Sequence, residues 1–128
     1  MSASPASLLK SKMLADMENE KNSQALKKAK LGVKKFPKDP DFWSMCGFAL
    51  QSEKQYKKAA HYFLGAAKLR PGNEKDVENL VYALESSNQV SLAENYLAKT
   101  IEKYPENIHF VMFLGQFLAR GQRWNELV

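Results

Sequence analysis

Few residues of this chain are of a type that could do chemistry. One cysteine, Cys46, and two histidines, His61 and His109, supply its thiol and imidazole groups. A structural zinc site takes four such ligands, so this set predicts no metal centre. The sequence also lacks a glycine-rich phosphate loop, a His-Glu-x-x-His pair and a Gly-x-Ser-x-Gly nucleophile elbow. We therefore expect no enzyme active site and no cofactor.

Lysines are the other chemically notable feature, because the net charge is +5 and unevenly distributed. Residues 1–39 carry nine Lys or Arg against four Asp or Glu, whereas residues 74–107 carry three against seven. A dense basic run could bind phosphate or an acidic partner, or it could be a solvated face near the end of a helix, where the helix dipole favours cations. No arginine lies in the run to stack on bases, so the sequence does not favour a nucleic acid partner. The run consists of Lys27, Lys28, Lys30, Lys34, Lys35 and Lys38.

The composition is that of a globular protein, with 45% apolar and 26% charged residues in 128. Charged residues interrupt every apolar stretch before it reaches the roughly 18 residues that a membrane span needs. The first ten residues lack a basic opening and a sustained apolar core, so we expect no signal peptide. The expectation is a cytoplasmic protein that does not enter a membrane.

The elements that would position any site follow from an internal repeat. Pro37, Pro71 and Pro105 lie 34 residues apart, and sliding the sequence by 34 aligns further apolar positions. Regular spacing of this length is typical of solenoid architectures. The aligned columns include Trp43/Val77/Val111, Cys46/Leu80/Leu114, Gly47/Val81/Gly115, Leu50/Leu84/Leu118, Ala25/Ala59/Ala93 and Ala29/Phe63/Leu97.

Each repeat divides into two helical patterns. Trp43, Cys46, Gly47 and Leu50 follow the spacing i, i+3, i+4, i+7, which places them on one face of a helix. After a polar turn the same period resumes over residues 56–69 and ends before a proline, which cannot continue a helix. The unit is therefore a helical hairpin, and Cys46 is predicted to be a small core residue because leucines occupy its column.

These positions resemble the tetratricopeptide repeat family, whose 34-residue pattern runs aromatic, Leu-Gly, aromatic, Ala, Phe, Ala, Pro. The resemblance implies an all-α fold, a right-handed superhelix (α-solenoid) of about three and a half stacked antiparallel hairpins, in one domain over residues 1–128. The units are 6–39, degenerate in its first helix and suited to an end cap, then 40–73, 74–107 and an incomplete 108–128. The best match lies in residues 40–73, through Trp43, Gly47, Tyr56, Ala59, Phe63, Ala66 and Pro71.

The last unit carries an unusually apolar stretch. Residues 108–118 are apolar nearly all round a helix, and such a helix must be covered on most sides. We expect residues 122–128 to begin the second helix of the hairpin, with Trp124 and Leu127 inward. The uncovered remainder predicts either a longer solenoid or self-association through residues 108–128.

In this family the first helices of the units line a concave groove that holds a peptide or helix of a partner. By that resemblance we expect a partner-binding groove formed by Ser44, Met45, Phe48, Asn79, Tyr82, His109, Met112, Phe113 and Gln116. The carboxylate clamp of chaperone-binding members is not predicted, because Leu14 and Met45 stand where hydrogen-bonding side chains are needed.

Two functional classes remain open. In the first, the chain is not an enzyme but a protein–protein interaction module, a scaffold or adaptor whose ligand is a protein or peptide. In the second, it is the N-terminal recognition arm of a larger multidomain enzyme such as a transferase.

Overall fold

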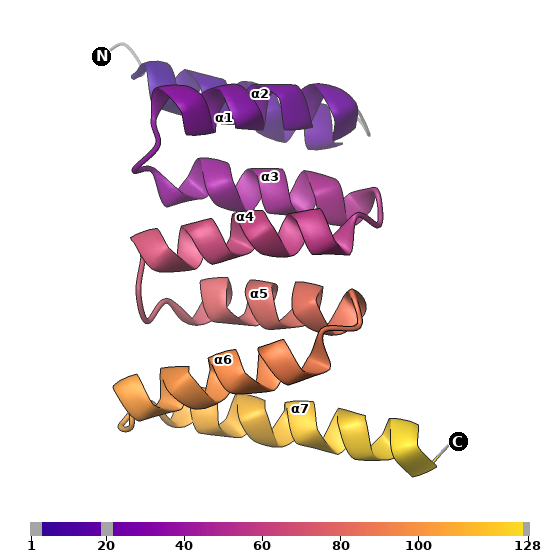
Figure 1. The fold of residues 1–128 in the computed structure, drawn as a ribbon. Coiled ribbons are helices and arrows are strands. Elements are labelled where there is room, and N and C mark those ends of the chain that lie inside the picture. The colour runs from indigo at the N-terminus through magenta and orange to yellow at the C-terminus, as the bar shows by residue number, and fades with distance from the viewer. Residues whose placement is uncertain (1–3, 19–21, 127–128) are drawn as a thin grey trace.

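The computed structural model describes residues 4–18 and 22–126, and all regular structure in these ranges is helical (Figure 1). The helices follow one another as antiparallel neighbours in a single stack, and each contacts the next along the chain. The described helices are α1 (Pro5–Glu18), α2 (Asn22–Lys35), α3 (Pro40–Ser52), α4 (Tyr56–Leu69), α5 (Glu74–Ser86), α6 (Val90–Lys103) and α7 (Ile108–Glu126). The predicted helical solenoid of about three and a half hairpins is confirmed.

The 34-residue period extends to the backbone signals that begin and end the helices. Asp39 and Asn73 are the N-caps of α3 and α5, and Asn107 takes the same place before α7; each side chain accepts a backbone N–H from the first turn at 3.0 Å. The turn inside each hairpin has one left-handed residue, Lys54 with φ 61° and Asn88 with φ 62°. Both signals lie 34 residues apart, so the repeat is a repeat of conformation as well as of core positions.

Small residues let the two helices of a hairpin approach closely, as the pattern predicts. A Cβ at Gly47 of α3 would lie 2.5 Å from Cε1 of Phe63 on α4. A Cβ at Gly65 of α4 would lie 2.3 Å from Cε3 of Trp43 on α3. Each glycine therefore provides the space that an aromatic ring of the opposite helix occupies. Cys46 is fully buried beside them, which confirms its prediction as a core residue.

The first unit keeps the hairpin but rearranges its core. Met13 of α1 is fully buried, whereas Lys12 is exposed. Asp16 is buried and pairs with Lys28 of α2, so a carboxylate occupies a position where the repeat has leucine. The α1 helix thus packs through its own set of residues, in keeping with its degenerate sequence.

The prediction for the last unit is wrong in one respect. Residues 122–126 do not start a second helix; they continue α7 without a break from Ile108 to Glu126. A two-turn helix has too few hydrogen bonds to offset the free-energy cost of its nucleation, whereas extending an existing helix adds a hydrogen bond for each residue. The side chain of Trp124 and the whole of Leu127 lie outside the described part of the structure.

Candidate partner-binding surface

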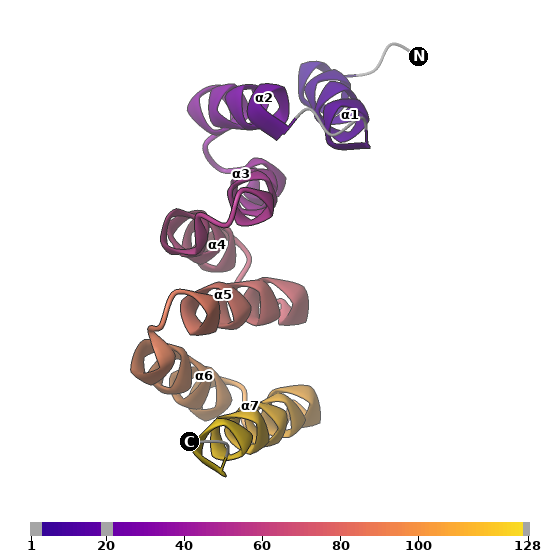
Figure 2. The same cartoon turned by 90° about the vertical axis from the view of Figure 1, so that its right-hand side faces the viewer.

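The first helices of the hairpins lie on one side of the stack and the second helices on the other (Figure 2). In this view α1, α3, α5 and α7 follow the inner side of a shallow curve, and α2, α4 and α6 follow the outer side. We call the inner side the concave surface; the nine predicted groove residues belong to α3, α5 and α7, which contribute to it.

Three large side chains on these helices are open to solvent. Phe48 on α3 is 37% exposed, Tyr82 on α5 is 51% exposed and Met112 on α7 is 60% exposed. Phe48 also contacts the core, because its ring meets Phe63 edge-on at 5.2 Å between centroids. Successive layers of the stack therefore each present one large aromatic or thioether group.

The other predicted residues differ in how much they offer to a ligand. Gln116 is exposed, whereas Asn79 is half-buried. Met45 and Phe113 are half-buried and pack against the core clusters of their layers. Ser44 is only 8% exposed, and its buried Oγ has no hydrogen-bond partner among the described residues. Ser44 therefore contributes little surface.

A histidine–carboxylate hydrogen bond and an ion pair tie neighbouring repeats together near these helices. His109 Nε2 lies 2.8 Å from Glu78 Oε1, and Arg120 lies 3.2 Å from Glu85, both joining α7 to α5. These contacts hold His109, a predicted groove residue, beside an acidic neighbour on the previous layer. The polar side chains here are thus largely engaged with one another, and the free contact area is apolar.

A second charge network joins the first three units. Lys10 Nζ lies 2.7 Å from Asp39 and 3.0 Å from Asp41. Arg70 reaches the same Asp41 at 3.3 Å and binds Asp76 through two nitrogens, at 2.7 and 3.0 Å. The hydrogen bond from Lys10 lowers the pKa of Asp41, against the opposing effect of partial burial. Lys10, the one lysine that a chaperone clamp would use on α1, is occupied by this network.

The potentially reactive residues lie apart from one another. Burial raises the pKa of the Cys46 thiol to about 12, so it is neither a thiolate nor accessible. His61 is exposed on α4, an outer-side helix, whereas His109 is on α7, an inner-side helix (Figure 2). The described residues contain no group of three or more His, Cys, Asp or Glu that could hold a metal, and none of the described helices is both long and apolar enough to cross a membrane.

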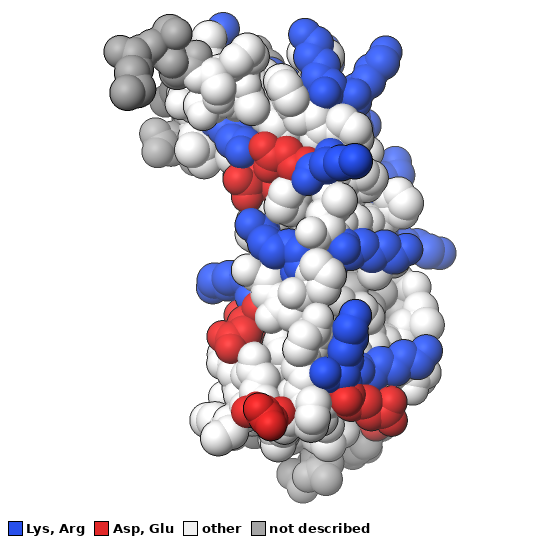
Figure 3. Space-filling view, turned by 90° about the vertical axis from the view of Figure 1, so that its left-hand side faces the viewer, with Lys and Arg blue, Asp and Glu red and all other residues white. Residues whose placement is uncertain are grey.

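The lysine run lies on α2, an outer-side helix, and at Lys38 in the loop that follows it. Lys28 pairs with Asp16, and Lys34 and Lys35 occupy the last turn of α2. Lys68 and Lys103 occupy the last turns of α4 and α6, so cations end each second helix. Figure 3 shows cationic side chains gathered towards the edge that these helix ends form. This placement is what the helix dipole favours.

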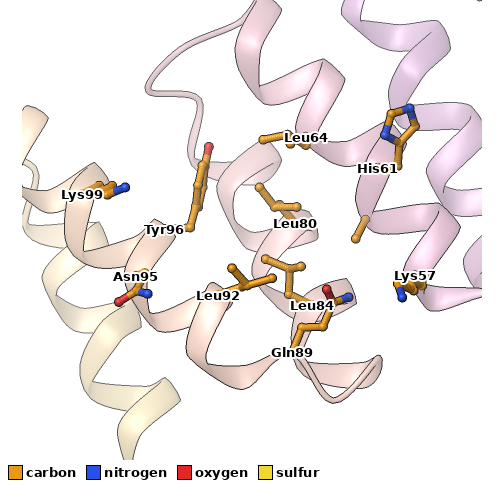
Figure 4. A pocket seen from close by; sticks show the side chains of 11 residues that line it. Lys57, His61, Leu64, Leu80, Leu84, Gln89, Leu92, Asn95, Tyr96 and Lys99 are labelled. Carbon is orange, nitrogen blue, oxygen red and sulfur yellow. The ribbon is translucent and has the colours of Figure 1, made fainter.

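One hollow was missed by the sequence analysis. It lies between α4 and α6, has a volume of about 480 Å³, and four of its eleven lining residues are leucines (Figure 4). Its residues come from two helices of different repeats, from the α5 helix between them and, at Gln89, from the turn before α6. Leu92 was the available signal, because it places an aliphatic side chain in the column where the previous repeat has Lys58.

No family model matches this sequence, and no curated protein matches it. Solved structures of helical repeat proteins do match. The Yersinia enterocolitica type III secretion translocator chaperone SycD is 19% identical, with a TM-score of 0.76 over 98% of this chain and 97% of that one. The Sgt2 TPR domain from Aspergillus fumigatus is 21% identical, with a TM-score of 0.75 over 98% of this chain and 85% of that one. The first TPR domain of Spaghetti (RPAP3), bound to an HSP90 peptide, is 18% identical, with a TM-score of 0.72 over 90% and 91%.

The stack of hairpins therefore has the fold of tetratricopeptide repeat domains, and the resemblance found in the sequence is confirmed as a likeness of fold. None of these three proteins is named as an enzyme.

Proposed function

We propose that this chain is a protein-interaction module that binds a peptide or helix of a partner protein on its concave surface. The observation that carries the proposal is the exposed row of Phe48, Tyr82 and Met112 on successive first helices. Large aromatic and methionine side chains supply most of the binding energy at such surfaces. The RPAP3 domain with its HSP90 peptide supports peptide binding in general, since it is a protein of this fold bound to a peptide.

The row predicts the chemistry of the ligand. Because the neighbouring charges are paired with one another, the free contacts on α5 and α7 are apolar with a few amides. A ligand helix with apolar residues at i, i+3, i+4 and i+7 would place one side chain against each layer. The same surface would serve if the chain were a recognition arm of a larger enzyme, because the arm would bind its substrate protein in the same way.

A peptide selection tests this proposal. Peptides are selected from a displayed library on the wild-type chain, and affinities are then measured for the Tyr82→Ser and Met112→Ser variants. Each substitution should weaken binding by about 1–2 kcal/mol, roughly tenfold, without lowering stability, because both side chains are more than half exposed. The matched control is Val90→Ser, an exposed apolar residue at the start of α6 that does not line the hollow between α4 and α6. Selected peptides that bind equally well to both concave variants would contradict the proposal.

We propose further that α7 supports self-association. Its outward face repeats the columns that α3 buries beneath α4: Val111 for Trp43, Leu118 for Leu50, and a glycine in each. Val111 is 49% exposed and Leu118 is 42% exposed, and a Cβ at Gly115 would meet no atom within 4 Å. A second copy can cover this face by placing its own α7 there.

Light scattering should find a concentration-dependent dimer that Val111→Glu abolishes and Leu8→Glu on α1 preserves. A monomer at every concentration would contradict this proposal.

A further inference from the structure

The hollow between α4 and α6 is an apolar site separate from the concave surface. Leu80 and Leu84 of α5 form its floor, and Ala60, Leu64, Leu92 and Tyr96 form its walls (Figure 4). Leu80 and Leu84 lie one turn apart on one side of α5, whereas Tyr82, two residues from each, lies on the opposite side. We call this hollow the outer pocket. It can be occupied while the concave surface is also occupied.

The repeat itself explains how the pocket forms between α4 and α6. Ala60 occupies the column where α2 has Leu26, and Leu26 packs against the core cluster that includes Ala60. The smaller side chain at Ala60 leaves space between α4 and α6. Leu92 occupies the column of Lys58, so an aliphatic wall replaces a charged one. Leu92 is 54% exposed, and the pocket is therefore open on that side.

The rim of the pocket is cationic. Lys57 and His61 border it on α4, and Lys99 borders it on α6. No carboxylate lines it, and within the described ranges neither lysine has an ion-pair partner. Lys68 lies seven residues after His61 on α4, and Lys103 lies four residues after Lys99 on α6. By this spacing each lysine is on the same helix face as the rim residue before it. An apolar centre between two cationic borders complements a ligand with an apolar centre and negative ends.

We propose that the outer pocket binds an acidic amphipathic peptide segment, whose leucine or aromatic side chain enters between Leu64 and Leu92 while its carboxylates lie over Lys57 and Lys99. The open mouth favours a peptide over a free fatty acid. Pockets for small ligands bury most of the ligand surface, whereas here a detached acyl chain would stay partly in water. A peptide covers the mouth with its own neighbouring residues.

The chain provides two variants that its own repeat already tolerates. Ala60→Leu places the residue of the α2 column in the pocket and fills it. Leu92→Lys places the residue of the α4 column on the wall and removes the apolar contact. Circular dichroism and thermal melting should find both variants folded with stability near that of the wild type. Ala60→Leu introduces the residue that is packed at position 26, and Leu92→Lys introduces the residue found at position 58.

The experiment uses two labelled synthetic peptides with the same leucine spacing, one flanked by glutamates and one by lysines, and reads binding by fluorescence anisotropy. We expect the glutamate peptide to bind, the lysine peptide to bind at least about tenfold more weakly, and salt to weaken the glutamate peptide. Ala60→Leu should cost about tenfold or more. Leu92→Lys, compared with the wild type at high salt so that its added cation is screened, should cost about as much. The control Met112→Lys, on the concave surface, should leave the affinity unchanged.

Four outcomes would overturn the proposal. Equal binding of the two peptides would remove the charge argument, and unchanged binding by Ala60→Leu would place the peptide elsewhere. Oleate binding that Ala60→Leu abolishes, without binding of the glutamate peptide, would assign the pocket to a lipid. If Met112→Lys alone weakens the peptide, it binds the concave surface, which supports the proposed function while rejecting the outer pocket.

Discussion

Replacing Arg70 by alanine tests how charge is held inside this stack. Asp76 lies on α5 in the column of Phe42 and Phe110, and its side chain is 2% exposed. Its carboxylate accepts two hydrogen bonds from Arg70, and these bonds raise the pKa of the guanidinium. Arg70→Ala would leave a buried carboxylate without its cation.

The expected cost follows from the burial of the two partners. Removing one member of a buried ion pair typically costs about 3–5 kcal/mol. Arg70 itself is 38% exposed, so water can enter the vacated space and solvate Asp76 in part. The lost contact to Asp41 adds little, because that carboxylate is 47% exposed. We therefore expect a loss of about 2–3 kcal/mol, which corresponds to roughly 10 °C in a domain of this size.

Urea denaturation followed by circular dichroism measures this loss, and a double variant separates charge from packing. Arg70→Leu/Asp76→Leu removes both charges and keeps apolar volume, so its stability should return to that of the wild type or exceed it. A single variant within about 0.5 kcal/mol of the wild type would refute the reasoning. So would a double variant as unstable as the single one, because the loss would then come from packing.

Three further predictions concern the core and its polar border. Burial raises the pKa of Cys46 to about 12, so a thiol reagent at neutral pH should react at the rate of unfolding; immediate labelling would contradict its burial. The hydrogen bond from Lys10 lowers the pKa of Asp41 below its usual 3.8. The wild type should therefore be more stable than Asp41→Asn at neutral pH, and this advantage should disappear as the pH falls below about 4. An advantage of equal size at about pH 7 and below about pH 4 would contradict this. Gly65→Ala should lower stability by about 1–3 kcal/mol because its Cβ would overlap an indole ring, whereas Gly115→Ala, with open space, should raise it by up to about 1 kcal/mol; equal effects in urea titrations would contradict the packing.

The regular part of the fold could be predicted from the sequence because it depends on residue type at a fixed period. Two helices pack closely when large side chains such as Trp43 and Phe63 face small ones such as Gly47. This alternation of large and small residues can be recognised in the sequence. The caps at Asn73 and Asn107 follow the same period and were available as a signal, two residues after each proline.

The parts that were not predicted depend on contacts and volumes that exist only in the folded chain. Asp76 occupies a core column, and a buried aspartate is expected there only when Arg70 is known to bind it. The distance between their atoms is set by the folded loop and not by the sequence pattern. The continuation of α7 past residue 121 depends on whether forming a new turn or adding helical hydrogen bonds has the lower free energy. The spacing of apolar residues does not indicate which of the two is favoured. The outer pocket depends on the small side chain of Ala60, and the columns Leu26/Ala60 and Lys58/Leu92 show the changed residues without showing that the helices leave the space unfilled.

The most direct test of the concave surface is a site-specific photo-crosslink. A photoreactive phenylalanine replaces Tyr82 on α5 in one protein and the exposed Glu94 on α6 in another, and each is irradiated with a peptide selected on the wild-type chain. We predict that the peptide is captured at position 82 and not at position 94. Capture at position 94 without capture at 82 would contradict the account, because the ligand would then lie on the outer side of the stack.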